Sequence, residues 1–227
     1  MTAAQPDPIA APTTALEESF RPYFLSDNYL SGQPNQGTLR VDGDERVVVL
    51  PEELICGLHR ALEYETGHAW PIVAYTCGRK WGQRLLAHWR GEWARHYGVA
   101  LDDAPFPHFE VWLAEAFAFF GWGRLEVDFS LEQRGVVQCF LEQSVLARLL
   151  KDVVEHDHVC EIFTGLFAAV ISDLAGVELE ALEVACEAGG HRRCHFVVAR
   201  EAYIERARSA RLDGGSPEAI LEALLAD

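Results

Sequence analysis

The strongest pattern along the chain is a helical repeat of apolar residues in its second half. Between Val159 and Gly176, apolar residues recur three and four positions apart, which predicts an amphipathic helix that ends at the glycine. A Trp, Leu or Tyr residue stands at every fourth position from Trp81 to Tyr97, which indicates a second long helix over residues 71–97. Shorter helices are predicted at residues 51–67, 107–120 and 144–156 and from residue 216 onward.

Alternation of apolar and polar residues marks the strands. Residues 125–129 alternate strictly, and residues 136–141 follow after a turn, so the two runs are expected to pair. A hairpin is predicted at residues 38–50 around Asp42-Gly43-Asp44, and a closing hairpin pairs residues 179–186 with residues 194–199. Because helices separate these hairpins, we expect an α+β fold with an antiparallel sheet and packed helices.

Composition narrows the classes of function. The 227 residues include 19 Lys and Arg against 35 Asp and Glu, a net charge of −16 that repels phosphate backbones and anionic lipid surfaces. We therefore exclude nucleic acid and peripheral membranes as primary partners, and no apolar run is long enough for an integral membrane protein. Residues 1–18 are expected to form a disordered tail rather than a signal peptide, which favours a cytoplasmic protein.

Candidate chemistry is concentrated in the last third of the chain. Cys160 stands near the predicted start of the amphipathic helix, where the helix dipole favours a thiolate. Glu183, Cys186 and Cys194 lie along the closing hairpin, with the two cysteines at the ends of its turn. Three sulfur atoms and one carboxylate would complete the tetrahedral shell of a structural Zn²⁺.

Spacing alone leaves alternatives open. The cysteines can simply be small core residues, since free cysteines are often buried. Glu183 and Cys186 would face opposite sides of a regular strand, so the strand must twist or end between them, or His191 replaces the glutamate. We expect Arg192 and Arg193 to offset part of the negative charge that would remain around a bound ion. The remaining cysteines are interpreted as core thiols: Cys56, Cys77 and Cys139.

The closing segment resembles a known family. Residues 183–198, E-V-A-C-E-A-G-G-H-R-R-C-H-F-V-V, and the preceding helix that begins H-V-C-E-I-F-T-G at His158 resemble the 4-vinyl reductase domain. That domain occurs in a bacteriochlorophyll-synthesis protein, in cyanobacterial proteins linked to photosystem assembly, and in sensor regions of phenol-responsive transcription activators. We assign residues 101–200 to this domain, 19–100 to the hairpin-and-helix segment before it, and 201–227 to a C-terminal helical tail, all within one compact unit.

The resemblance implies a structural zinc, a fold and an assembly. In the aromatic-sensor branch, three cysteines and one glutamate hold zinc. Here the matching positions are Cys160, Glu183, Cys186 and Cys194, which favours Glu183 over His191. The implied fold is shared with haem-based nitric-oxide sensors and Golgi-tethering subunits. Family members often dimerise and enclose a hydrophobic pocket, so a homodimer is expected.

Aromatic residues are crowded between positions 106 and 129 and offer wide surfaces for stacking on a planar ligand. For any single residue among them, membership of an aromatic core is the simpler explanation. His108 could ligate the magnesium of a tetrapyrrole or bond an aromatic hydroxyl. The candidate pocket residues are His108, Trp112, Phe117, Phe120, Trp122 and Phe129.

Three functions compete at this point. The first is a zinc-stabilised protein that binds a porphyrin or chlorophyll precursor and passes it to a tetrapyrrole-synthesis enzyme or a photosystem assembly factor, in chlorophyll or bacteriochlorophyll biosynthesis. The second is a vinyl reductase, which we favour less because the sequence has neither a G-x-G-x-x-G after a strand nor a flavin signature. The third is a stand-alone sensor or scaffold for small aromatics. No catalytic residue is assigned.

Overall fold

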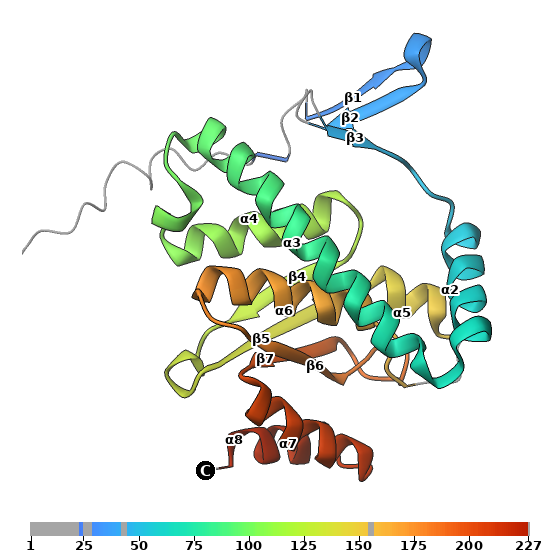
Figure 1. Cartoon of the computed structure of the whole chain (residues 1–227), viewed down its shortest axis with the longest axis vertical. Helices are drawn as coiled ribbons and strands as arrows, with labels where there is room; N and C mark the ends of the chain where they lie inside the picture. Colours follow the sequence, from blue (N-terminus) through green and yellow to red (C-terminus); the bar gives the residue numbers. More distant parts are fainter. Residues whose placement is uncertain (1–22, 25–28, 42–44, 154–156, 227) are drawn as a thin grey trace, which may run out of the picture.

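The structure, a computed structural model, describes residues 23–24, 29–41, 45–153 and 157–226. Helices and antiparallel strands alternate along these residues, which confirms the expected α+β fold (Figure 1). The predicted tail at residues 1–18 and the turn Asp42-Gly43-Asp44 lie outside the described residues.

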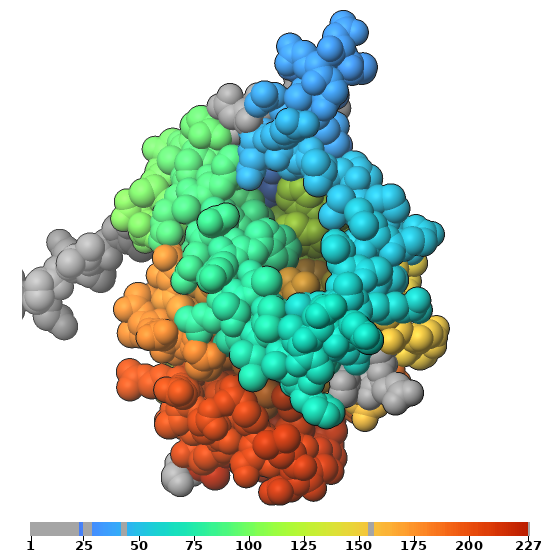
Figure 2. All heavy atoms as spheres, turned by 45° about the vertical axis from the view of Figure 1, so that its right-hand side comes forward, coloured from blue at the N-terminus to red at the C-terminus, as the bar shows by residue number. Residues whose placement is uncertain are grey.

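A small antiparallel sheet projects from one end of the molecule (Figures 1 and 2). It consists of β1 (Leu30–Gln33), β2 (Thr38–Val41) and β3 (Glu45–Val47), with β2 in the centre and a short 3-10 helix, η1 (Pro34–Gln36), between β1 and β2. We call residues 29–50 the arm. The strand β1 was not predicted, because Leu-Ser-Gly-Gln carries no alternation of apolar and polar residues.

Three helices follow the arm. They are α2 (Glu52–Thr66), α3 (Trp70–Tyr97) and α4 (Phe106–Phe119), with short 3-10 helices η2 (Gly67–Ala69) and η3 (Leu101–Asp103) between them. The aromatic stripe predicted for α3 faces the main core, where Trp89 and Trp93 are buried. None of the helices within the described residues is long and apolar enough to cross a membrane.

The main sheet has four antiparallel strands in the order β4-β5-β7-β6. The strands are β4 (Arg124–Asp128), β5 (Val136–Glu142), β6 (Glu180–Ala185) and β7 (Cys194–Ala199), and η4 (Glu132–Arg134) forms the turn between β4 and β5. The helix α6 (Glu161–Ala175) lies between α3 and one face of the sheet, and α7 (Glu201–Leu212) and α8 (Pro217–Leu225) lie on the other side (Figure 1). Each face of the sheet therefore has its own apolar cluster.

Glycines permit a close crossing of α3 and α6. A Cβ atom on Gly165 would lie 2.0 Å from the backbone oxygen of Tyr75, and one on Gly78 would lie 2.0 Å from that of Ile162. Both positions therefore require glycine. Because α6 begins directly after Cys160, this contact also fixes the place of that cysteine.

The helix predicted over residues 144–156 is shorter in the structure. It becomes α5 (Val145–Leu150), capped at its start by the Ser144 side chain, which accepts a hydrogen bond of 3.3 Å from the Ala147 backbone N–H. Residues 154–156 lie outside the described residues. Leu150 is buried in the core, and the chain turns after it towards the start of α6.

Candidate metal centre and apolar cleft

Four buried side chains converge where the closing hairpin meets the start of α6. Cys160 immediately precedes α6, and Glu183 lies within β6. Cys186 follows the end of β6, and Cys194 is the first residue of β7. One ligand atom from each side chain lies within 4.8 Å of the others. The structure thus brings together all the residues that were predicted as metal ligands, which we call the Cys–Glu cluster.

A β-bulge explains how Glu183 and Cys186 reach the same site. Glu183 pairs with Phe196, whereas Ala185 pairs with His195, so the register shifts by one residue on β6. Such a bulge bends and twists its strand and redirects the side chains that follow. The strand therefore turns between Glu183 and Cys186, as their spacing requires.

The spacing of the three sulfur atoms matches a tetrahedral metal shell. The Cys160 sulfur lies 3.8 Å from the sulfurs of both Cys186 and Cys194, which are 3.7 Å from each other. Zinc–sulfur bonds of roughly 2.3 Å at tetrahedral angles place sulfur atoms about 3.8 Å apart. All three thiols are free, and their separations are far longer than a disulfide bond.

The Glu183 carboxylate completes the donor set. Its Oε2 accepts a hydrogen bond of 3.0 Å from the backbone N–H of Cys160. Its Oε1 is buried and has no hydrogen-bond partner among the described residues. A buried carboxylate oxygen without a partner is unfavourable, and a cation at the centre of the cluster would supply that partner. The residues present therefore fit a zinc ion in both donor type and spacing.

Burial adds an electrostatic argument for a cation. Removal from water raises the pKa of the Glu183 carboxyl and of the Cys160 thiol, because burial disfavours their charged forms. The negative charge of neighbouring Cys186 raises the pKa of Glu183 further. Hydrogen bonds from the other two thiols lower the pKa of Cys186, and a bound cation would stabilise the deprotonated forms of the remaining donors as well.

Arg192 and Arg193 do not approach the cluster, contrary to our expectation. Arg192 lies 3.6 Å from Glu142, and Arg193 lies 3.1 Å from Glu126 and over the ring of Phe140. Both belong to the β6–β7 turn, and the carboxylates with which they pair are on β4 and β5. Their position next to Cys194 in the sequence did not predict the direction of their side chains.

Two supporting side chains were missed from the sequence. Arg211 of α7 donates a hydrogen bond of 3.1 Å to the backbone oxygen of Glu183. The Glu187 carboxylate accepts hydrogen bonds from the backbone N–H groups of Gln143, at 2.8 Å, and Ser144, at 2.9 Å. The first contact ties α7 to β6, and the second ties the closing turn to the end of β5. Neither contact has a local signal, because each joins residues far apart in the chain.

The two histidines of the closing hairpin lie outside the Cys–Glu cluster. His191 is exposed on the turn, where its backbone N–H bonds the Cys186 oxygen at 3.2 Å. His195 is buried, and its Nε2 lies 3.1 Å from the side-chain oxygen of Gln138. The geometry therefore places Glu183, and not His191, beside the three sulfurs.

The other cysteines occupy three different environments. Cys139 is fully buried, as expected of a core thiol. Cys56 is half-buried, and its thiol donates to the Leu149 backbone oxygen at 3.4 Å. Cys77 is exposed, which corrects its assignment to the core. It lies on the solvent side of α3, because the buried face of that helix is set by its glycines and tryptophans.

The aromatic candidates for a ligand pocket fall into separate environments. Trp112 and Phe117 of α4 are fully buried in the main core, and Trp112 stacks on Tyr23 with ring centroids 4.5 Å apart. Phe120 and Trp122 are half-buried and stack on each other at 4.9 Å. Contact between any of these residues and a ligand stays a prediction, as it does for the half-buried His108.

An apolar cleft of about 280 Å³ opens beside the remaining candidate, Phe129. It lies between the start of α4, the end of α6 and the adjoining ends of β5 and β6. Phe106 packs edge-on against Phe129 with centroids 4.1 Å apart, and Glu132 and Arg200 are the charged residues of the lining. Its apolar walls include Phe106, Phe129, Val137, Ile171, Leu174 and Leu179. From the sequence, we expected the apolar face of this helix to pack in the core, and did not predict a cleft beside it.

Comparison with known proteins finds a family match for part of the chain, residues 141–200. Residues 141–200 match the model of the 4-vinyl reductase (V-4-R) domain family, which confirms the resemblance seen in the sequence. This stretch contains the whole Cys–Glu cluster. The search of curated proteins finds no match.

Similarity to one of three solved structures extends to the rest of the fold. The phenol-responsive sensory domain of the transcription activator PoxR, solved with phenol, is 18% identical with a TM-score of 0.62, and the match covers 95% of this chain and 100% of that domain. Trafficking protein particle complex subunit 3 of Naegleria fowleri, covalently bound to palmitic acid, is 17% identical with a TM-score of 0.46 and covers 65% of this chain and 93% of its own. A vinyl-4-reductase family protein of Methanocaldococcus jannaschii is 15% identical with a TM-score of 0.43. The match covers 69% of this chain and 83% of that protein. The chain therefore has the fold of the PoxR sensory domain along almost its full length.

Proposed function

We propose that this protein binds a small aromatic or apolar molecule in the cleft beside Phe129, and that a structural zinc ion stabilises the fold. The observation that carries the zinc is the spacing of the three Cys–Glu cluster sulfurs, at 3.7 and 3.8 Å. Cys160, Glu183, Cys186 and Cys194 would hold the ion. When bound, it would join the closing hairpin to the start of α6 and perform no redox or hydrolytic chemistry.

The ligand site is proposed on the size and lining of the cleft. A volume of about 280 Å³ is at the lower end for pockets that hold small molecules, and its walls are mainly apolar. One aromatic ring is the ligand that such a space encloses best. The shared fold with a domain that was solved with phenol supports this class of ligand. The chain would then act as a sensor or scaffold for small aromatics.

A tetrapyrrole is the second candidate, and it rests on the match to the 4-vinyl reductase domain. A porphyrin or chlorophyll precursor is larger than the cleft, so it would bind across the open side with the Phe106–Phe129 pair against one face. In the cytoplasm, the protein would then deliver this precursor to a tetrapyrrole-synthesis enzyme or a photosystem assembly factor. A vinyl reductase remains the alternative within this context, and its reductant would have to come from another source.

The ligand is tested by titration of the full chain with phenol and, separately, with a magnesium porphyrin. We expect phenol to raise the melting temperature and to give a binding isotherm. The variant Ala175→Trp should weaken phenol binding at least about tenfold, because the new ring would occupy the mouth of the cleft. A matched control is Ile72→Trp, an exposed apolar position on α3 away from the cleft lining.

Each outcome of this titration decides between the candidates. Phenol binding that Ala175→Trp abolishes and Ile72→Trp leaves intact supports the small-aromatic site. A shift of the porphyrin absorption bands without phenol binding would favour the tetrapyrrole. If neither ligand produced a response at high micromolar to millimolar concentration, the binding function would be wrong.

A homodimer is proposed through the arm and α2. Val48 and Val49 at the end of the arm are 69% and 81% exposed, and Leu58 of α2 is 60% exposed. Figure 2 shows the tip of the arm projecting from one end of the molecule, above α2. Exposed apolar surface of this kind is usually covered in an assembly. Light scattering should give twice the 25.3 kDa chain mass, and the double variant Val49→Asp, Leu58→Asp should halve it.

A control for the dimer uses an exposed apolar residue elsewhere. Ile72→Asp removes an apolar side chain of comparable exposure, 69%, from the surface of α3. It should leave the mass unchanged. A natural chain that stays monomeric at high micromolar concentration would contradict the homodimer.

A further inference from the structure

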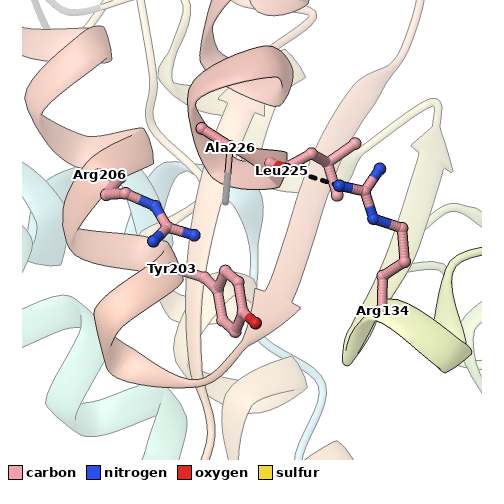
Figure 3. A pocket seen from close by; sticks show the side chains of 5 residues that line it. All are labelled: Arg134, Tyr203, Arg206, Leu225 and Ala226. Carbon is pink, nitrogen blue, oxygen red and sulfur yellow. Dashed lines mark hydrogen bonds between the residues drawn. The ribbon is translucent and has the colours of Figure 1, made fainter.

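A second pocket lies on the α7–α8 side of the molecule, and its lining differs in kind from the apolar cleft. Its volume is about 270 Å³, and five residues line it: Arg134, Tyr203, Arg206, Leu225 and Ala226. Figure 3 shows the two guanidinium groups on opposite sides of the pocket, with the end of α8 above them and the Tyr203 ring below. Two arginines facing one cavity suggest a negatively charged occupant.

Among the described residues, both arginines donate hydrogen bonds to the end of α8. Arg134 donates through Nη2 to the Leu225 backbone oxygen at 2.5 Å, and Arg206 donates through Nη2 to the Leu224 oxygen at 3.2 Å. The guanidinium carbon of Arg206 lies 4.7 Å from the centroid of the Tyr203 ring. The Arg206 Nε is buried and has no hydrogen-bond partner among the described residues. Within the part of the chain that the structure describes, each guanidinium group therefore keeps donors without a protein partner.

Counted over the described residues, the charges around this pocket do not balance. The C-terminal end of a helix is equivalent to roughly half a negative charge, whereas the two arginines bring two full positive charges. Within the described ranges, neither Arg134 nor Arg206 forms an ion pair with a carboxylate. By contrast, several other arginines of the chain do so: Arg79, Arg90, Arg124, Arg148 and Arg208. A local excess of positive charge is unusual in a chain with a net charge of −16.

We propose that this pocket binds the oxyanion group of a small molecule, a carboxylate or a phosphate, between Arg134 and Arg206. The planar guanidinium groups match the paired oxygens of either anion. The Tyr203 ring and the Leu225 side chain would contact the apolar part of an organic acid. The site does not depend on the proposed cleft or on the metal centre, because none of its residues belongs to either.

Calorimetric titration of the full chain tests the site with three probes: inorganic phosphate, acetate and benzoate. Chloride keeps the ionic strength constant, so that general screening does not imitate binding. We expect saturable binding of at least one probe. Arg134→Ala and Arg206→Ala should each weaken it about tenfold, because each removes charge-assisted hydrogen bonds. Arg206→Lys should have an intermediate effect, since it keeps the charge and loses the planar fork.

The control is Arg208→Ala, which removes a positive charge from the same helix at a residue that pairs with Glu205. It should bind the probes as the natural chain does. Benzoate binding tighter than acetate would identify an organic acid as the ligand class, and a preference for phosphate would identify a phosphate ester. Circular dichroism and the melting temperature of each variant show whether α7 and α8 remain folded.

Three results would overturn the proposal. The first is no saturable binding of any probe by the natural chain. The second is an equal loss in Arg208→Ala and Arg206→Ala, which would reveal a general charge effect. The third is binding by Asp227→Asn but not by the natural chain, which would mean that the acidic residue after Ala226, outside the described residues, competes for the pocket.

Discussion

The Cys–Glu cluster and the aromatic helix α4 are both buried, yet they differ in what burial does for them. In α4, Trp112 and Phe117 are removed from water and packed against other rings, and this alone stabilises the fold. In the Cys–Glu cluster, burial raises the pKa of Glu183 and leaves its Oε1 without a hydrogen-bond partner among the described residues. Burial stabilises the first region by itself, whereas under our proposal the second region is stabilised only when it holds an ion.

The largest expected effect comes from removing a ligand of the Cys–Glu cluster. Cys186→Ala should lose the metal and lower the free energy of unfolding by about 5 kcal/mol or more, because structural zinc contributes roughly 10–16 kcal/mol in small domains. Urea unfolding with and without a chelator measures the loss. Chelator should destabilise the natural chain and leave Cys186→Ala unaffected.

The matched control for that variant is Cys139→Ala, at a cysteine that is equally buried but outside the cluster. It should lower the free energy of unfolding by only about 1 kcal/mol, because the packing of one sulfur atom is lost. The metal content should be unchanged. Equal losses in the two variants would show that the Cys–Glu cluster is ordinary core.

The aromatic region is tested by Trp112→Ala. Loss of a fully buried indole should lower the free energy of unfolding by about 3–5 kcal/mol. The folded fraction should retain its metal, because no atom of Trp112 belongs to the cluster. Metal analysis after gel filtration checks this point, and loss of the metal with retention of the fold would contradict the separation of the two regions.

The crossing of α3 and α6, which positions the start of α6 at the Cys–Glu cluster, is tested by Gly165→Ala. The added methyl group would lie 2.0 Å from the Tyr75 backbone oxygen, so α3 and α6 must move apart, at a cost of about 1–3 kcal/mol. The control Gly57→Ala, in α2 with no atom within 4 Å of the added methyl, should stabilise the protein by about 0.5–1 kcal/mol. Melting temperatures that shift in the same direction for both variants would refute the close packing.

The smallest expected effect concerns the end of β6 away from the Cys–Glu cluster. The Tyr75 hydroxyl donates to the Glu180 carboxylate and accepts from the Ala181 backbone N–H at 3.3 Å. Burial first, and then the bond to Glu180, raise the pKa of Tyr75 to about 12. Tyr75→Phe should lower the free energy of unfolding by about 1 kcal/mol near neutral pH, because the hydroxyl's hydrogen bonds are lost.

The pH dependence of that contact has a definite sign. In the unfolded chain Tyr75 loses its proton near pH 10, so between about pH 10 and 12 the folded protein holds the extra proton. The stability due to this residue is complete below pH 10 and falls as the pH rises towards 12. Unfolding curves of the natural chain and of Tyr75→Phe should therefore converge across that range. A constant difference would show that burial does not shift the Tyr75 pKa.

Local patterns predicted the regular elements, whereas the family resemblance was needed to choose Glu183 over His191 in the Cys–Glu cluster. The repeat of apolar residues located α3 and α6, and the alternation located β4 and β5. The spacing of Glu183 and Cys186 also required a break in the strand, which the bulge supplies. The helices, the strands and the break in β6 depend on residues that are close in the sequence, so short stretches of sequence were sufficient to predict them.

Features that depend on distant residues were not predictable in this way. The contact of Arg211 with the Glu183 backbone and the glycine crossing of α3 with α6 each join segments far apart in the chain. The aromatic residues of α4 were equally consistent with a pocket and with a core, because composition does not say which face another helix covers. The arginines of the second pocket had no signal, since residues 134 and 206 meet only through the fold.

The central claim is that three cysteines and one glutamate hold a zinc ion between the closing hairpin and α6. X-ray absorption at the zinc edge of the purified full chain tests it most directly. We predict one zinc per chain with three sulfur neighbours at about 2.3 Å and one oxygen at about 2.0 Å. A folded, chelator-insensitive protein without zinc, or a zinc shell that contains no sulfur, would contradict the account.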